Sequence, residues 1–192
     1  MQETAQEVLA FWFGAPGSPV RGNARAEWFR KDDAFDDEIR RRFGEAIEVA
    51  LAGGLGEWCT NADGSLARIL LLDQFTRNAY RETARAFAGD PRALATAEEA
   101  VARGFDRELA PRERWFMYMP FEHAESVPAQ HRSLELFAAL AQELGDDDPL
   151  VWARKHAEVI FRFGRYPHRN AVLGRASTSE EEAYLRTPGA GF

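Results

Sequence analysis

The 192-residue sequence predicts an all-α protein. Apolar residues recur three and four positions apart in successive segments of about 12 to 20 residues, which is the spacing of one helix face. Proline or a capping residue stands at the start of most of these segments, and glycine ends several of them. No segment shows the alternation of apolar and polar residues that is typical of a strand.

Three helices are predicted in the N-terminal half of the chain, over residues 4–13, 32–51 and 65–80. The first ends where glycines and prolines fill residues 14–19. The second begins with two aspartates at 32–33, which suit the positive end of a helix dipole, and is closed by Gly53. The third follows a turn over residues 61–64 and is capped by Ser65. Its first half is apolar on most faces, so we expect it to be central, with its polar residues facing a cleft.

Further helices are predicted in the C-terminal half, beginning at Asp90-Pro91, Pro111, Ser126, Asp148-Pro149 and Thr178. Proline fits the first helical turn because its missing N–H has no partner there. Asp90 is interpreted as the N-cap of the helix that runs to Arg103. Thr178 and Glu181 match a capping box for a terminal helix, and residues 187–192 are predicted to fray.

Short turns between these helices favour antiparallel helix pairs stacked in an array similar to tetratricopeptide repeats, within a single domain over residues 1–192.

A net charge of -7 argues against nucleic acid and anionic membranes as partners. The single cysteine, Cys59, excludes an intrachain disulfide. Because residues 1–4 carry no basic leader and no apolar stretch approaches about 20 residues, we expect a cytoplasmic protein. The sequence does not predict the oligomeric state.

Three segments, at 72–78, 119–125 and 156–175, carry dense polar residues among large apolar ones. Six cations lie between Arg154 and Arg175 against one carboxylate, Glu158. Arginine forms bidentate hydrogen bonds with carboxylates and phosphates, so this grouping predicts a site for an anionic small molecule or peptide. The alternative is a set of internal ion pairs that hold helices together. The candidate ligand-binding residues are Asp73, Arg77, Asn78, Arg81, Glu122, His156, Arg162, Arg165, Arg169, Asn170 and Arg175.

His123, Glu125 and His168 are the candidate catalytic residues. A neutral imidazole accepts a proton near pH 7, and a neighbouring carboxylate such as Glu125 would fix its tautomer. The alternative is a histidine that is simply packed and hydrogen-bonded. Histidine and glutamate also bind metals, but no paired spacing such as His-Glu-x-x-His occurs, so neither a metal nor another cofactor is predicted. A nucleophile elbow and a phosphate-binding glycine loop are also missing from the sequence.

Three motifs carry a family resemblance: Leu71-Leu72-Asp73-Gln74-Phe75-x-Arg77-Asn78-x-Tyr80-Arg81, Pro120-x-Glu122-His123-x-Glu125 and Arg162-Phe163-Gly164-Arg165-Tyr166-Pro167-His168-Arg169-Asn170. With them, the chain resembles the bacterial family catalogued as domain of unknown function nine-two-four. The pattern extends from Val8-Leu9-x-Phe11-Trp12-Phe13-Gly14 to Leu173-Gly174-Arg175-x-Ser177-Thr178. The resemblance implies an all-helical fold similar to tetratricopeptide repeats and leaves the reaction and the partner open.

Three hypotheses of function follow. The leading one is a helical-repeat binding protein whose cleft accepts an anionic small molecule or a peptide end. The second is a hydrolytic enzyme in which His123 or His168 is a general base oriented by Glu125, with arginines stabilising negative charge. The third is a protein-interaction scaffold with an exposed apolar groove. If the arginines await a ligand, substituting Arg165 or Arg169 lowers stability little; if they hold helices together, it lowers stability strongly.

Overall fold

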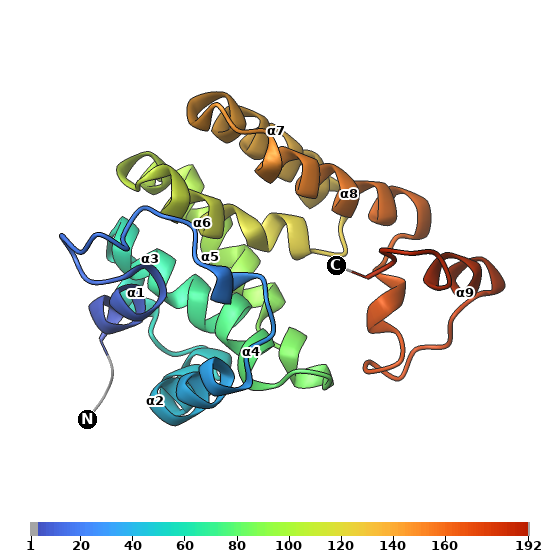
Figure 1. Ribbon diagram of the computed structural model, residues 1–192, viewed down its shortest axis with the longest axis horizontal. Helices are drawn as coiled ribbons and strands as arrows, with labels where there is room; N and C mark the ends of the chain where they lie inside the picture. The colour runs from blue at the N-terminus through green and yellow to red at the C-terminus, as the bar shows by residue number, and fades with distance from the viewer. Residues whose placement is uncertain (1–3, 192) are drawn as a thin grey trace.

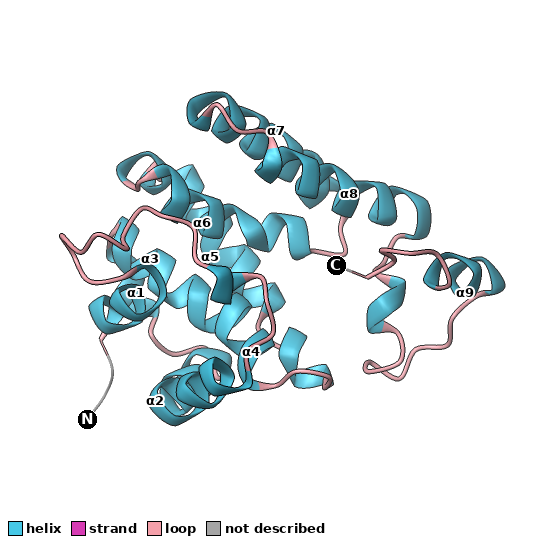
Figure 2. Cartoon of the chain, in the orientation of Figure 1, coloured by secondary structure: helices cyan, strands magenta, loops and turns pink. Residues whose placement is uncertain are grey.

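The computed structural model describes residues 4–191 and confirms the all-α prediction. Within this range the chain forms helices, turns and loops, and no strand (Figure 2). Residues 1–3 and Phe192, on which the predictions of a leader-free start and a frayed end partly rest, lie outside the described residues. No helix between residues 4 and 191 is long and apolar enough to cross a bilayer.

The α-helices are α1 (Ala5–Phe13), α2 (Asp33–Leu51), α3 (Ala62–Ile69), α4 (Thr76–Ala79), α5 (Asp90–Ala102), α6 (Pro111–His123), α7 (Val127–Leu144), α8 (Asp148–Phe163) and α9 (Ser179–Leu185). A π-helical segment, η3 (Leu70–Phe75), joins α3 directly to α4. Short 3₁₀ segments occupy several connections: η1 (Ala26–Trp28), η2 (Gly56–Thr60), η4 (Ala84–Phe87), η5 (Phe105–Glu108) and η6 (Pro167–Arg169).

Most predicted helix starts are confirmed, but the start of α3 is not. Thr4 and Thr178 form capping boxes, and Asp32 caps α2. Ser65 is not a cap, because Asn61 accepts a hydrogen bond from the Gly64 N–H at 2.9 Å and α3 begins before it. A Cβ at Gly64 would lie 1.9 Å from the Trp58 carbonyl oxygen. Gly64 therefore allows close packing inside a helix and does not form the predicted turn.

The helices pack into a body with a separate C-terminal segment (Figure 1). α3 packs against α1 and α5, and α2 packs against η3 and α4. α7 and α8 form an antiparallel pair that lies along α6. After Gly164 the chain turns away from the C-terminal end of α8, and η6 and α9 lie to the right of the main body in Figure 1. The regular repeat-like stacking predicted from the sequence stays a prediction.

The apolar core lies in the main body, and the C-terminal segment has a small cluster of its own. The main core runs from α1 to α8 and contains fully buried rings such as Trp12, Phe75 and Phe116. The second cluster consists of Val159, Ile160 and Tyr166, with Phe163 and Tyr184 packed against it. Because so few apolar residues support the C-terminal segment, polar contacts carry much of its attachment to the main body.

One glycine, Gly89, allows the backbone before α5 to pack directly on the π-helical segment η3. A Cβ at Gly89 would lie 2.1 Å from the Leu72 carbonyl oxygen, so the backbone before α5 rests directly on η3. Gly89 has φ -85 and ψ -15, a conformation open to any residue. Glycine is therefore required here for contact and not for backbone freedom. The contact brings the first residue of α5, Asp90, beside α4.

We predict that Gly89→Ala lowers the free energy of unfolding by about 1–3 kcal/mol, because the added methyl forces η3 and α5 apart. Gly44→Ala is the matched control: Gly44 lies in α2 with no atom within 4 Å of an added Cβ. This control should gain about 0.5–1 kcal/mol from the better helix propensity of alanine. Urea unfolding of both variants measures the difference. Equal stabilities would contradict the close contact.

Candidate functional site

Buried and half-buried polar side chains meet where η3, α4, α5, α6, α8 and η6 come together; we call them the central cluster. Its members are Asp73, Arg77, Asp90, Glu122, His123, His156, Tyr166, His168 and Arg169. Asp73 lies within the π-helical segment, whose widened turn is a feature frequently found at functional sites. Glu122 and His123 form the last turn of α6, directly opposite α8.

A short, buried contact in the central cluster joins Asp73 to His123. Asp73 Oδ1 lies 2.7 Å from His123 Nδ1, and Asp73 is fully buried. Gln74 Nε2 donates to the other carboxylate oxygen of Asp73 at 2.6 Å. A carboxylate that accepts the Nδ1–H fixes the tautomer of the imidazole and leaves Nε2 with a lone pair.

Burial and neighbouring charges determine the protonation of this pair. Burial alone would raise the pKa of Asp73, but Arg77 and His123 beside it hold that pKa below its usual value. Burial lowers the pKa of His123 and the charge of Arg77 lowers it further, although Asp73 acts in the opposite direction. The pair at neutral pH is therefore an aspartate beside a neutral imidazole.

Two arginines share the carboxylate of Asp90. Arg77 donates to its two oxygens at 2.8 and 3.0 Å, and Arg169 donates to one of them at 3.0 Å. The Arg169 guanidinium also lies 4.5 Å from the ring centroids of both Phe87 and Tyr166. The interpretation of Asp90 as an N-cap is wrong: Gly89 occupies the cap position, and the side chain of Asp90 is held by the two guanidinium groups. Within the described residues the buried Nε of Arg169 has no hydrogen-bond partner.

Glu122 and His156 form a second buried pair next to His123. His156 Nδ1 lies 2.9 Å from Glu122 Oε1 and 2.9 Å from the carbonyl oxygen of Trp152. The other oxygen of Glu122, Oε2, is buried without a hydrogen-bond partner in the part of the chain that the structure describes. Glu122, His123 and His156 each offer one ligand atom, and these atoms lie within 4.8 Å of one another.

Tyr166 and Gln130 close the end of α6. The hydroxyl of Tyr166 donates to the carbonyl oxygen of Glu122. Gln130 Nε2 donates to the same carbonyl at 2.8 Å and to the Tyr166 hydroxyl at 3.1 Å. Sequence reasoning missed Gln130. The available signal was its position on the apolar face of the 126–144 helix, three residues before Ser133 and six before Leu136, where a polar residue needs a buried partner.

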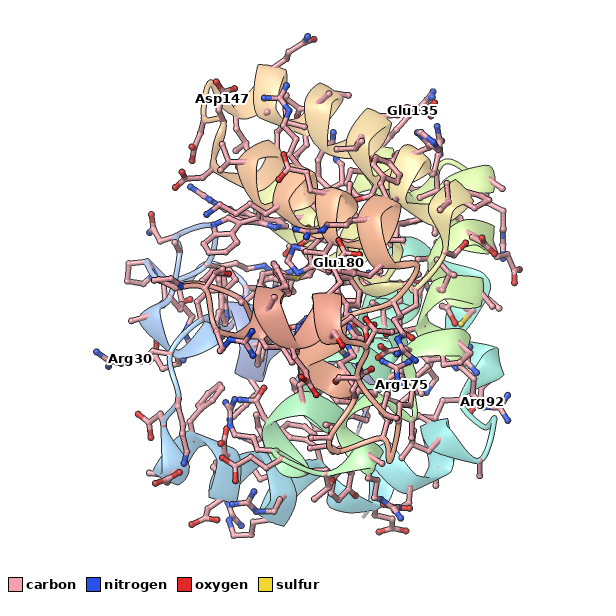
Figure 3. All side chains as sticks on the ribbon, turned by 90° about the vertical axis from the view of Figure 1, so that its right-hand side faces the viewer. Arg30, Arg92, Glu135, Asp147, Arg175 and Glu180 are labelled. Carbon is pink, nitrogen blue, oxygen red and sulfur yellow. The ribbon has the colours of Figure 1, made fainter. Side chains whose placement is uncertain are left out.

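A second polar network, the C-terminal clasp, consists of Glu125, Arg165, Asn170, Arg175 and Glu181. Arg175 donates to both oxygens of Glu125, at 2.6 and 2.8 Å. Arg165 donates to both oxygens of Glu181, at 2.6 and 2.8 Å, and so lowers the pKa of that carboxylate. Figure 3 faces the C-terminal segment that these residues stabilise and labels Arg175 and Glu180 on it.

Comparison with known proteins decides the family. The sequence pattern of the family described as "Bacterial protein of unknown function (DUF924)" matches residues 8–189. The chain belongs to this family. A solved structure of a protein of unknown function from Agrobacterium tumefaciens is similar, with a TM-score of 0.82 and 41% sequence identity over 95% of this chain and 96% of that chain. None of the curated proteins matches the chain.

In this DUF924 chain, the predicted site residues fall into several groups. Asp73, Arg77, Glu122, His123, His156, His168 and Arg169 lie in the central cluster, whereas Glu125, Arg165, Asn170 and Arg175 lie in the C-terminal clasp. Asn78 and Arg81 instead bond to Asp36 of α2. Arg162 is exposed and pairs with Glu180 at 2.8 Å.

The expected partner of His123 is also corrected. Glu125 does not orient this imidazole, because both of its oxygens bond to Arg175 and one accepts the N–H of Tyr166 at 2.7 Å. Asp73, 50 positions earlier in the chain, takes that role. Adjacency in sequence was misleading because α6 ends at His123, so Glu125 follows the loop away from the ring.

A surface hollow lies apart from the Asp73–His123 pair. It has a volume of about 510 Å³ and is lined by α8 and the C-terminal tail, including Trp152, Lys155, Arg162 and Tyr184. Of the predicted ligand-binding residues only Arg162 lines it. The central cluster is instead closely packed, since the side chains of His123 and His156 are 11% and 8% exposed. The central cluster therefore lies outside this hollow, and little of its histidine surface is exposed.

We predict that Arg165→Ala lowers the free energy of unfolding by about 1–3 kcal/mol, because it leaves the buried Glu181 without its bidentate partner. Arg132→Ala is the control. Arg132 pairs with Glu135 at 2.8 Å, but both side chains are exposed, at 47% and 67%. Its loss should cost under about 0.5 kcal/mol. If chemical denaturation shows a small and equal loss of stability for both variants, the charge of Arg165 is available to bind a ligand.

Stability should also depend on pH through His168. Burial, together with the charge of Arg169, lowers the pKa of His168 to about 4, below the 6.5 of an unperturbed histidine. Below pH 6.5 the unfolded chain therefore binds more protons than the folded one. This contribution to stability is present above pH 6.5 and is lost as the pH falls toward 4. Urea unfolding across this range should give a shallower slope for His168→Gln; an unchanged slope would contradict the depressed pKa.

Proposed function

We propose that the chain is a hydrolytic enzyme that acts on a small anionic substrate, with His123 activating water and Asp73 orienting His123. The observation that carries this proposal is the 2.7 Å contact between the Asp73 carboxylate and His123 Nδ1 in a nearly water-free setting. A buried carboxylate that holds a neutral imidazole in one tautomer is a recurring element of hydrolytic sites. The proposal rests on this pairing and not on the family, which has no assigned reaction.

His123 has the properties that water activation needs. Burial and Arg77 lower its pKa, so the ring is neutral at pH 7 and its Nε2 lone pair is available. The side chain of His123 keeps 11% of its surface exposed, which gives water a path to the ring. Asp73 cannot itself be the proton acceptor, because Arg77 and Gln74 stabilise its charge.

The anionic character of the substrate is inferred from Arg169 and Arg77. Arg77 and Arg169 share the Asp90 carboxylate, and Arg77 also pairs with Asp73 at 3.1 Å, so Arg169 is the less fully compensated of the two guanidinium groups. The Nε of Arg169 has no partner within the described residues, and rings on both sides hold the guanidinium in place. A preorganised cation of this kind stabilises negative charge that develops during hydrolysis.

The leading sequence hypothesis, a cleft of free arginines that simply binds an anion, receives less support. Arg165 and Arg175 each make bidentate pairs with their own carboxylate, and Arg162 pairs with Glu180. Guanidinium groups that are already neutralised add little attraction for a ligand. The interaction-scaffold hypothesis stays a prediction. Its support is three exposed apolar side chains on α8: Val151, Trp152 and Phe161.

The experiment is a screen of the purified full chain against small carboxylate-bearing esters, amides and phosphate esters, followed by substitution of the pair. His123→Asn should lower kcat/KM by about 100-fold or more, the usual contribution of a positioned base. Asp73→Asn should lower kcat more than it raises KM, because it disturbs the tautomer and not substrate binding.

His131→Asn is the matched control, since His131 lies on α7 and contacts Phe161 instead of the central cluster. It should retain full activity. Circular dichroism and thermal unfolding of all three variants separate loss of chemistry from loss of fold. Hydrolysis that survives His123→Asn in a folded protein would exclude the proposed role.

A further inference from the structure

The central cluster contains three side chains whose arrangement the pairing of Glu122 with His156 accounts for only in part. Glu122, His123 and His156 come from the end of α6 and from α8, and each offers a ligand atom within 4.8 Å of the other two. We infer that these three residues bind one divalent transition-metal ion of the zinc type. The sequence had predicted no metal, because two of the ligands are adjacent and the third is 33 positions away.

The donor set suits such an ion. Two imidazoles and one carboxylate are ligands of zinc, iron and manganese, whereas calcium and magnesium prefer oxygen donors alone. With tetrahedral bonds of about 2.0–2.2 Å, ligand atoms on one ion lie about 3.3–3.6 Å apart. The observed separations, which do not exceed 4.8 Å, would therefore close by up to about 1.5 Å through side-chain rotation when the ion binds. Three protein ligands also leave a coordination position open for water, as in catalytic zinc sites.

An independent observation comes from the carboxylate of Glu122. The residue is 2% exposed, and its Oε2 has no hydrogen-bond partner in the described part of the chain. A buried carboxylate oxygen without a hydrogen-bond partner destabilises the folded state, and it does so more than an unpaired neutral polar atom. The arginines of the central cluster do not relieve this cost, because Arg77 and Arg169 bond to Asp73 and Asp90. A bound cation would satisfy Oε2.

The ring of His123 is held as metal-binding histidines usually are. A ligating imidazole almost always donates its second ring N–H to a carboxylate or a carbonyl group. His123 Nδ1 lies 2.7 Å from Asp73 Oδ1, which leaves Nε2 as the ligand atom. His156 Nδ1 lies 2.9 Å from both the Trp152 carbonyl oxygen and Glu122 Oε1, so this ring is already held beside the proposed carboxylate ligand. The lowered pKa of His123 adds support, because only neutral imidazole coordinates a metal.

The balance of charged side chains in the central cluster also supports a bound cation. The carboxylates of Asp73, Asp90 and Glu122 outnumber the two guanidinium groups of the central cluster. One of these guanidinium groups, Arg77, is engaged by Asp73 at 3.1 Å and by Asp90 at 2.8 Å. A divalent ion beside Glu122 compensates the excess negative charge of this buried region.

When the ion is bound, the Nε2 lone pair of His123 is used in coordination, so the metal, in place of His123 as a base, would activate the water of the proposed function. A zinc-bound water loses its proton to solvent near pH 7, and the resulting hydroxide is a nucleophile at neutral pH. As a mechanism this step rests on the proposed hydrolytic function, whereas binding of the ion does not.

Metal binding is tested without an activity assay. The tag-free full chain is stripped with a chelator, dialysed and titrated with Co²⁺, whose visible absorption reports its coordination, and with Zn²⁺ in calorimetry. We expect one ion per chain. Glu122→Gln and His156→Gln should each weaken binding by at least about 100-fold, and Asp73→Asn by about 10- to 100-fold. His131→Gln is the control and should bind like the unaltered chain.

Several results would overturn the inference: no uptake, or affinities of folded Glu122→Gln and His156→Gln equal to that of the unaltered chain. If circular dichroism shows that one of these two variants does not fold, the affinity of the other variant alone decides the test. Metal uptake without any hydrolysis would remove the proposed function and keep the metal site. Hydrolysis that depends on His123 and persists in the chelator-stripped chain would keep the function and remove the metal site.

Discussion

The buried carboxylate of Asp73 is the constraint on which the arrangement of the site depends. A charge with no access to water must be compensated by its neighbours, and here Gln74, Arg77 and His123 supply the compensation. Each of these contacts fixes another element. Arg77 connects α4 to Asp90 at the start of α5, and His123 connects η3 to the end of α6. The π-helical turn and the close packing of Gly89 allow these elements to approach one another.

The C-terminal segment is joined to this arrangement by polar side chains more than by an apolar interface. Its own apolar cluster is small, and Arg169, Tyr166 and Arg175 reach back to Asp90, Glu122 and Glu125. Ion pairs of this kind add modest net stability because both partners lose water, but they admit only one arrangement of the segment. The motif Arg162–Asn170 therefore has two structural roles. Part of it packs against the central cluster, and part of it forms the ion pairs that hold α9.

The imidazoles, not the arginines, give the site its chemical character. Most arginines in the basic segment are matched by carboxylates, which explains how six cations can gather within 22 residues of an acidic protein. His123 stays neutral through burial and Arg77, while Asp73 fixes its orientation. A neutral, oriented imidazole next to Glu122 and His156 can accept a proton or coordinate a metal ion, and these are the two uses that we propose for it.

The sequence by itself determined the fold class, most helix limits and the three segments that supply the site, because apolar periodicity and capping are local properties of the chain. It could not determine which side chains pair. Asp90 resembled an ordinary helix cap, and Glu125 lay nearer to His123 in sequence than Asp73 did. Partners 50 positions apart are chosen by how helices pack, which depends on contacts such as Gly89 on Leu72 that no local pattern records.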